Sequence, residues 1–316
     1  MGESINGYVI TKKLGIADAG MCRWGFAEKN GREYFIKEFL KPTYPLDDSI
    51  MGPEITRQMQ LTADKFERDR RAYYDRLRTC RTGNNIIILD FFRYKTKYYA
   101  VTDKVDGKLL SVRDVARLPA DQKYTLIKSL LYSIAKLHEA GIVHSDLKPE
   151  NILIHETKGS FCAAKIIDFD AGYLEKDPPE NIEGSQNYFS PEAVLKINGK
   201  SADMTVWSDV FALGLLLHQY WCGEMPGFSE EYHYAAEAVL QDSPLQLNEN
   251  IPAELQKLIA SMLHKDHLMR PTAREAWEKV RRMGDGPEPV PVIPVKEELP
   301  SKPVEPGFQK LNDNNL

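Results

Sequence analysis

The residues best suited to chemistry in this sequence lie in two short segments. The first, residues 144–151, holds Asp146, Lys148 and Asn151. The second ends an apolar run at Asp168. Together they offer a carboxylate to orient a hydroxyl, an amide and a second carboxylate to hold magnesium, and a lysine to steady a phosphoryl group. This set of groups predicts phosphoryl transfer from ATP with Mg²⁺ as the metal ion.

Both segments are predicted to be loops at the ends of strands. Pro149 and the apolar residues 152–154 place a strand directly after the first segment. The apolar pair 166–167 ends a second strand immediately before Asp168. The chemistry is therefore expected where two strands meet their loops.

The N-terminal third of the chain is predicted to be an antiparallel sheet interrupted by one helix. Apolar and β-branched runs predict the strands, and Asn30-Gly31 is typical of a tight hairpin turn between two of them. Phe66, Tyr73 and Leu77 are spaced by 7 and 4 residues, which marks one face of a helix. The predicted strands are residues 8–14, 21–28, 33–39, 86–94 and 97–105.

The rest of the chain is predicted to be mainly helical before a proline-rich tail. Residues 126–140 and 207–221 have helical patterns, and Gly141 fits a C-terminal stop for the first. A β-rich part followed by an α-rich part indicates the α+β class. Seven of the 19 prolines lie in 286–307, which predicts a disordered tail over 284–316. This tail is interpretable as a solvated linker or as a docking peptide for a proline-binding partner.

Composition excludes several classes of protein. With 42% hydrophobic and 28% charged residues, the 316-residue chain has the balance of a soluble globular protein. Its 41 basic and 46 acidic residues favour neither nucleic acid nor an anionic membrane as partner. The longest apolar run, residues 210–217, is too short to cross a bilayer, and the N-terminus lacks a signal pattern. A cytoplasmic location fits four scattered cysteines without a CxxC pair, Cys22, Cys80, Cys162 and Cys222.

Over residues 8–283 the chain resembles the eukaryotic-type protein kinase family, serine/threonine branch. The match includes the segments around Asp146 and Asp168, together with further motifs in the family's order. These are a glycine-rich loop at Gly15–Gly20 with Ala17 in place of the middle glycine, the strand Phe35-Ile36-Lys37, the sequence Ser190-Pro191-Glu192, and the helical-lobe residues Asp209 and Arg270.

The resemblance implies a bilobal fold of the α+β class. The N-lobe, about residues 8–104, would hold an antiparallel sheet and one helix, and the C-lobe, about residues 107–283, would be mainly α-helical. The implied reaction is transfer of the γ-phosphoryl group of ATP to a serine or threonine hydroxyl of a protein, with Mg²⁺ as cofactor. Lys148, two residues after Asp146, is the serine/threonine form of this loop.

The resemblance also implies roles for individual residues. Asp146 would accept or orient the proton of the substrate hydroxyl, and Lys148 would contact the transferring phosphate. Asn151 and Asp168 would hold Mg²⁺. Lys37 would grip the α- and β-phosphates of ATP.

The resemblance further implies a nucleotide pocket between the lobes. Thr102 would be the gatekeeper, Asp103–Val105 the hinge whose backbone binds adenine, and Leu153 the floor. Phe35 stands where the family has a small alanine, so its ring would share space with adenine. The other implied pocket residues are Gly15, Ala17 and Gly20 over the phosphates and Cys22 in the roof.

The acidic helix partner that the resemblance implies for Lys37 stays open among three residues. Glu67 is preferred, and Asp69 is a rival because Tyr73 follows it at helical spacing. Glu54 is the third choice. Each of these acids is also interpretable as part of a solvated helix face.

Two further expectations concern the catalytic loop and the segment that follows Asp168. Asp209 is expected to be a buried acid that braces the backbone of this loop. Ser145 stands where many kinases carry an arginine that receives an activation-segment phosphate, and no serine or threonine lies between Asp168 and Gly184. Ser185 is expected to hydrogen-bond the catalytic aspartate and lysine. We therefore predict activity without phosphate on this segment.

Three functions fit the sequence. A protein serine/threonine kinase is preferred, with ATP and a protein substrate as partners. A small-molecule kinase of the aminoglycoside-phosphotransferase type would also place HxD and an asparagine before an acidic strand. A pseudokinase scaffold is suggested by four departures, although none removes a metal ligand, the phosphate-binding lysine or the catalytic acid. The departures are Ala17, Phe35, Ser145 and Asp170.

Overall fold

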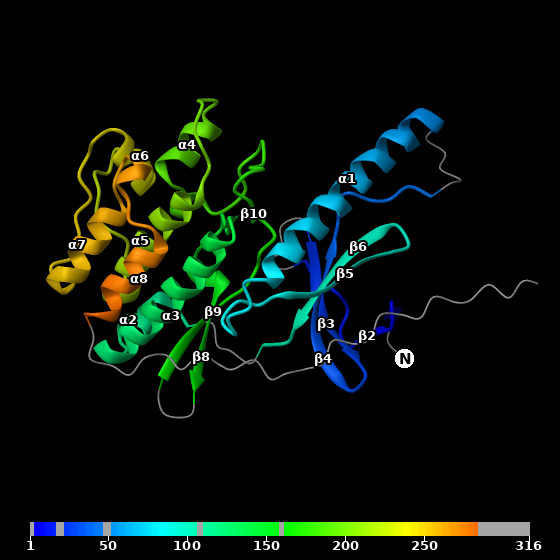
Figure 1. The fold of residues 1–316 in the computed structure, drawn as a ribbon, viewed down its shortest axis with the longest axis horizontal. Coiled ribbons are helices and arrows are strands. Elements are labelled where there is room, and N and C mark those ends of the chain that lie inside the picture. Colours follow the sequence, from blue (N-terminus) through cyan, green and yellow to red (C-terminus); the bar gives the residue numbers. More distant parts are fainter. Residues whose placement is uncertain (1–2, 17–21, 47–51, 106–109, 158–160, 284–316) are drawn as a thin grey trace, which may run out of the picture.

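The computed structural model divides into two lobes (Figure 1), which is the predicted bilobal α+β architecture. The N-lobe combines an antiparallel sheet with one long helix, and the C-lobe is mainly helical. The predicted tail and the glycine-rich-loop positions Ala17 and Gly20 lie outside the described residues. Across the part that is described, no helix is both long enough and apolar enough to span a membrane. The structure describes residues 3–16, 22–46, 52–105, 110–157 and 161–283.

The N-lobe sheet has six antiparallel strands in the order β1-β2-β3-β4-β6-β5. Asn30 and Gly31 join β3 to β4 with φ values of 55° and 74°, which confirms the predicted tight turn. The first predicted strand is shorter than expected, because regular pairing of β2 ends at Ile10. The strands are β1 (Ser4–Ile5), β2 (Tyr8–Ile10), β3 (Cys22–Lys29), β4 (Arg32–Phe39), β5 (Ile88–Tyr94) and β6 (Lys97–Asp103).

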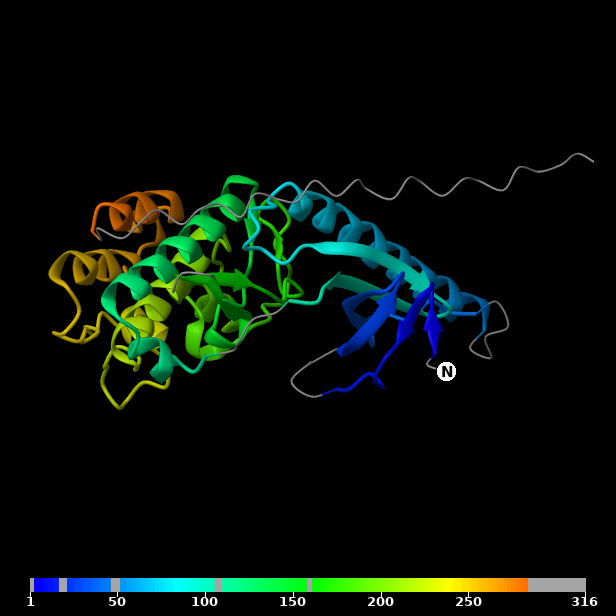
Figure 2. The same cartoon turned by 90° about the horizontal axis from the view of Figure 1, so that it is seen from below.

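Helix α1 (Pro53–Arg78) runs beside β5 toward the C-lobe (Figure 1, Figure 2). The predicted apolar face of this helix packs on the sheet. The ring of Phe66 lies 5.3 Å from that of Phe39 on β4, and the ring of Tyr74 lies 5.3 Å from that of Phe91 on β5. These ring contacts determine the position of α1 along the strands, and so which α1 side chains lie next to β4 and β5.

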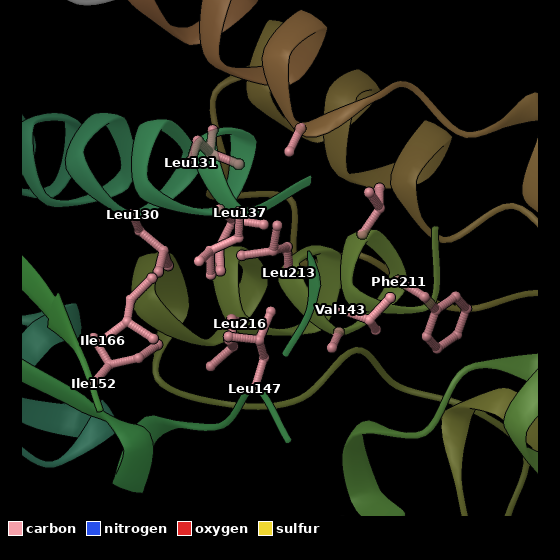
Figure 3. Close-up of a cluster of buried hydrophobic side chains, with 14 of the residues drawn as sticks. Leu130, Leu131, Leu137, Val143, Leu147, Ile152, Ile166, Phe211, Leu213 and Leu216 are labelled. Atoms are coloured by element: carbon pink, nitrogen blue, oxygen red, sulfur yellow. The ribbon is translucent and has the colours of Figure 1, made fainter. Parts of the chain in front are cut away.

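The C-lobe is built around α5 (Val206–Cys222), in which every residue from 208 to 218 is buried. Figure 3 shows Leu137 of α3 (Ala120–Glu139) in the same apolar cluster as Leu213 and Leu216 of α5. Gly141, with φ +66°, follows the end of α3 as predicted. The other helices are α2 (Val112–Ala116), α4 (Pro191–Ile197), α6 (Ala235–Leu240), α7 (Ala253–Met262), α8 (Ala273–Arg281) and the 3₁₀ turns η1 (Pro149–Asn151), η2 (Gln186–Tyr188) and η3 (His267–Met269).

Two small two-stranded sheets position the residues that the sequence selected for chemistry. Strand β8 (Ile152–Thr157) pairs with β9 (Phe161–Ile166), and Ile167 N donates to Asn151 O at 3.0 Å. This bond places Asn151 beside the residue that precedes Asp168. In the second sheet, β7 (Ile142–Val143), which directly precedes the catalytic loop, pairs with β10 (Tyr173–Leu174) in the segment that follows Asp168.

Candidate active site

The catalytic loop, residues 144–151, is held in place by hydrogen bonds from its backbone N–H groups to a side chain on α5. Asp209, buried near the start of α5, accepts hydrogen bonds from His144 N at 2.8 Å and from Ser145 N at 2.9 Å. Ser145 has φ +69°, a left-handed conformation that a non-glycine residue keeps only when its surroundings enforce it. The predicted bracing role of Asp209 is therefore confirmed.

Asp146 is held by contacts from three neighbours. Its Oδ1 accepts from Ser185 N at 2.9 Å, its Oδ2 accepts from Asn151 Nδ2 at 3.0 Å, and Lys148 Nζ lies 2.7 Å from the same Oδ2. Lys148 Nζ also donates to Ser185 Oγ at 2.9 Å, so the contacts expected of Ser185 are present. Asp146, Lys148 and Ser185 line a cavity of about 920 Å³. The carboxylate and the ammonium are thus fixed at the wall of a space large enough for a ligand.

Asn151 and Asp168 offer oxygen ligands next to this cavity. Asn151 Nδ2 donates to both Asp146 O and Asp146 Oδ2, at 2.8 and 3.0 Å, which leaves its amide oxygen as an acceptor. Burial opposes ionisation of Asp168, but the charge and the hydrogen bond of Lys37 lower the pKa of Asp168 below its usual value. An ionised carboxylate and an amide oxygen are hard donors, so their chemistry fits Mg²⁺.

Phe169 anchors the turn between two acids. Its side chain is 2% exposed, and its ring centroid lies 5.0 Å from that of His144. Asp168 and Asp170 on either side of it both line the cavity. The turn is therefore in the form in which the aromatic side chain is buried and the acids face the cavity.

Lys37 of β4 lies between two carboxylates. Its Nζ is 2.9 Å from Asp168 Oδ1 and 2.7 Å from Asp170 Oδ2, and its side chain is 12% exposed. Burial opposes the charge of this ammonium, but Asp170 and then Asp168 raise the pKa of Lys37 above its usual value. The ammonium is therefore charged throughout the physiological pH range.

The structure does not bring the preferred helix acid to Lys37. Glu67 Oε1 instead pairs with Arg71 Nη2 at 2.7 Å, one turn further along α1. Asp69 pairs with Lys65 at 2.7 Å. The physical reason is the position of α1 on the sheet, where Tyr74 packs on Phe91 in the strand row of Lys37. Residue spacing within the helix does not reveal that position.

The acid that reaches Lys37 is Asp170, which lies outside the three helix candidates. The remaining candidate, Glu54, lies in the exposed first turn of α1. The sequence signal for Asp170 was its position two residues after Asp168, at the end of a strand. That signal shows an acid near the metal-binding turn but not the direction of its side chain.

The predicted adenine pocket contains an aromatic cluster that the sequence revealed only in part. Phe35 lies opposite Thr102 of β6, its ring stacks on Trp24 at 5.5 Å, and it meets Phe26 edge-on at 6.0 Å. Trp24 lies opposite Lys37 in the sheet, so the cluster shares a face with the lysine. The Phe35 ring is therefore packed against its strand neighbours.

The other described pocket residues lie on or beside the strands, although Val105, predicted to end a strand, lies beyond the end of β6. Cys22 is buried, with Sγ 3.6 Å from Asp170 Oδ2, and burial raises the pKa of its thiol to about 12. A thiol of this kind is protonated and unreactive at neutral pH. Gly15 bridges to Trp24, Asp103 ends β6 in an ion pair with Arg32 at 2.6 Å, Val105 lies two residues further on, and Leu153 of β8 pairs with Lys165.

The segment after Asp170 is ordered by backbone and side-chain contacts. Ser145 Oγ donates to Glu183 O at 3.4 Å, and Glu175 Oε1 accepts from Val206 N at 3.1 Å. At its far end Glu192 accepts from Arg270 through two parallel bonds of 2.8 and 2.9 Å. The segment is thus fixed at its middle and at its end.

Comparisons with known proteins agree with this geometry. A model of the protein kinase domain family matches residues 8–280. The serine/threonine-protein kinase TIO of Arabidopsis thaliana is 26% identical over 209 residues, which are 65% of this chain and 15% of that protein. Calcium/calmodulin-dependent protein kinase type II of Caenorhabditis elegans is 32% identical over 234 residues, 71% of this chain and 31% of that protein.

A bacterial relative shows the same likeness. The probable serine/threonine-protein kinase PknB of Lactococcus lactis is 27% identical over 192 residues, 58% of this chain and 29% of that protein. The chain thus covers between 15% and 31% of the length of these three relatives. Because the family model matches most of the chain and the two lobes carry the family's motifs, the chain belongs to the protein kinase domain family.

Proposed function

We propose that this protein is a serine/threonine kinase that transfers the γ-phosphoryl group of ATP to a protein hydroxyl. The observation that carries the proposal is that Asp146 and Lys148 both hydrogen-bond Ser185. These contacts lie at the wall of the cavity that Asp168 also lines. Phosphoryl transfer depends mainly on positioning and charge, and this group supplies both. Because the relatives extend well beyond the matched region, the substrate remains part of the proposal.

In the proposed reaction the substrate hydroxyl oxygen forms a bond to the γ-phosphorus while the bond to the ADP oxygen breaks. Asp146 orients the hydroxyl and accepts its proton, and the ammonium of Lys148 steadies the charge of the transferring group. Lys37 binds the α- and β-phosphates. Asn151 and Asp168 would hold Mg²⁺, which when bound neutralises charge on the β- and γ-phosphate oxygens.

The proposal includes activity without phosphate on the activation segment. Ser145 replaces the arginine that receives such a phosphate, and its hydroxyl contacts Glu183 O instead. The bonds of Glu175 and Glu192 order the segment through groups that are permanently present. This ordering supports a kinase regulated by partners, expression or substrate supply.

The test is transfer of labelled phosphate from ATP to a generic protein substrate, by the natural protein and by an Asp168→Ala variant. We expect transfer only by the natural protein, and an equal thermal unfolding midpoint shows that the variant is folded. Transfer of equal rate by both proteins contradicts the proposal. Labelling of small hydroxylated molecules but no protein favours the small-molecule kinase.

A pseudokinase scaffold is the second candidate, and the cluster of Trp24, Phe26 and Phe35 favours it. Three aromatic rings share the face of the sheet that carries Lys37. If they fill the adenine space, the protein binds no nucleotide. Calorimetry with ATP and Mg²⁺ separates the two candidates, because only the kinase requires binding.

A further inference from the structure

We infer that Asp170 is the acid that positions Lys37, in place of a glutamate on α1. This inference rests on the proposed kinase function, in which Lys37 binds the ATP phosphates. A lysine in this position is useful only if its ammonium is held in one place. An acid on the helix and an acid on the metal-binding turn would reach the lysine from different elements of the fold.

The contacts of Lys37 carry the first step. Its Nζ lies 2.7 Å from Asp170 Oδ2 and 2.9 Å from Asp168 Oδ1, so one ammonium bridges two acids that are two residues apart. Asp168 is also the candidate metal ligand. Asp170 makes the shorter of the two contacts and has no other role in the proposed reaction.

The packing of α1 carries the second step. Tyr74 packs on Phe91, which lies opposite Ala100, and Ala100 lies opposite Lys37. Phe66 also meets Phe91, at 6.3 Å, so the aromatic contacts of α1 on this row come from Phe66 and Tyr74. Glu67 lies seven residues before Tyr74, about 10 Å along the helix axis at 1.5 Å per residue. Its carboxylate is paired with a neighbour on its own helix.

The charges around Tyr74 carry the third step. Its side chain is 1% exposed, burial raises the pKa of its hydroxyl, and the charges of Asp170 and Lys37 act on it. Arg70, one turn earlier, lines the same cavity as Asp170. At this level the described part of α1 therefore presents a phenol and a cation. The negative charge comes from the turn.

The first experiment measures nucleotide binding by calorimetry, with ADP in the presence and in the absence of Mg²⁺. Asp170→Asn keeps the shape of the side chain and removes its charge. We expect it to weaken ADP binding at least about tenfold under both conditions, since a hydrogen bond between charged groups is lost. Asp170→Glu retains the charge and should recover affinity to within about threefold.

The matched control is Glu67→Gln, the same chemical change on α1. We expect it to change ADP affinity less than about twofold, because its partner is an exposed arginine. If Asp170→Asn binds ADP as tightly as the natural protein does, the inference is wrong. Weakening of Asp170→Asn only when Mg²⁺ is present also overturns it, because that result makes Asp170 a metal ligand. A tenfold loss in Glu67→Gln overturns it as well.

A second measurement needs no nucleotide and separates this inference from the proposed function. Thermal unfolding of Lys37→Met, Asp170→Asn and their double variant tests whether the two residues interact. We expect the shift of the double variant to differ from the sum of the single shifts, whereas Lys37→Met with Glu67→Gln should be additive. Additive shifts for Lys37 and Asp170 overturn the inference. A natural protein that binds no nucleotide contradicts the kinase function, and the unfolding cycle then still decides the pairing.

Discussion

Two cations of this molecule each meet acidic oxygens, but in opposite surroundings. Arg270 pairs with Glu192 inside the C-lobe, where each residue is 4% exposed. Lys37 pairs with Asp168 and Asp170 at a cavity wall, where these acid side chains are 39% and 25% exposed. The pair of Arg270 and Glu192, called the sealed pair below, needs no ligand to balance its charges. The group of Lys37, Asp168 and Asp170, called the open pair, leaves carboxylate surface that a ligand can reach.

The neighbours of the two cations explain the difference. Arg270 also donates to Trp207 O and His264 O, both at 2.8 Å, and Ser208 Oγ donates to Glu192 at 3.0 Å. Its charge is therefore enclosed by protein partners on several sides. A sealed pair of this kind is expected to affect folding when broken, and an open pair is expected to affect binding and catalysis.

The largest predicted effect comes from breaking the sealed pair with Glu192→Gln. This change leaves the charge of Arg270 buried without a counter-ion, which should lower the free energy of unfolding by about 3–5 kcal/mol. Urea unfolding followed by circular dichroism measures it. A loss below about 1 kcal/mol would contradict the distinction, because exposed ion pairs have effects of that size.

The second prediction breaks the open site without breaking the fold. Asp146→Asn removes the carboxylate charge that receives the substrate proton, so the rate of phosphate transfer should fall at least about a hundredfold. The free energy of unfolding in urea should fall less than in Glu192→Gln, because the amide oxygen of the new asparagine can still accept the hydrogen bond from Ser185 N. The matched control is Asp242→Asn, which alters an exposed acid paired with Lys265. If Asp146→Asn retained most of its turnover, its proposed role would be wrong.

The third prediction extends the comparison to an exposed pair, Glu139 of α3 with Arg274 of α8. Burial alone would raise the pKa of Glu139, but contacts with Lys136 and Arg274 lower it below its usual value. A lowered folded pKa means that the stabilisation is present above the unfolded value, about 4.3, and is lost as pH falls through the folded value.

Arg274→Gln should therefore lower the free energy of unfolding by less than about 1 kcal/mol at pH 7, because water screens the pair. The difference between this variant and the natural protein should be smaller at pH 3 than at pH 7, as urea unfolding at both values can measure. An equal or larger difference at pH 3 would assign the effect to packing of the arginine on Trp277 rather than to charge.

The sequence predicted the fold where local chemistry determines local structure. Asn30-Gly31 forms its turn because both residues accept positive φ, and Gly141 follows the end of α3 for the same reason. Catalytic-loop contacts were also predictable. They were expected from the resemblance to protein kinases and not from local chemistry, because Asp209 lies 65 residues from His144 and Ser185 lies 39 residues from Asp146 in the chain.

The partner of Lys37 was not predictable in the same way. It depends on how β4, α1 and the turn after β9 lie relative to one another, and these elements are joined by segments whose geometry the sequence does not specify. A shift of two helical turns exchanges Glu67 for Tyr74 beside the lysine row. The aromatic cluster has the same origin, because Trp24 meets Phe35 only through the strand register.

A third position belongs in this comparison, the one directly before Asp146 in the sequence, where the arginine of many kinases is absent. Ser145 stands there, and the hydroxyls of Tyr173, Ser185 and Ser190 in the following segment are either buried or hydrogen-bonded. Tyr173 is 7% exposed, Ser185 Oγ accepts from Lys148, and Ser190 Oγ accepts from Ala193 N as the N-cap of α4. The segment therefore has neither a receiver for a phosphate nor a free hydroxyl of the usual kind to carry one.

The smallest predicted effect follows from this missing cation. Treating the purified protein with a broad phosphatase should change its initial rate on a peptide less than about twofold, because Ser145 replaces the arginine that would pair with a phosphate on this segment. Mass spectrometry must show that residues 168–192 are unmodified after treatment. The phosphatase has to be removed before the assay, and a mock-treated sample is the control. The prediction is wrong if the initial rate falls tenfold or more and rephosphorylation within 168–192 restores it. That result would mean that another cation receives the phosphate, and Arg70, whose guanidinium feels the charge of Glu183 on this segment, would be the first to substitute.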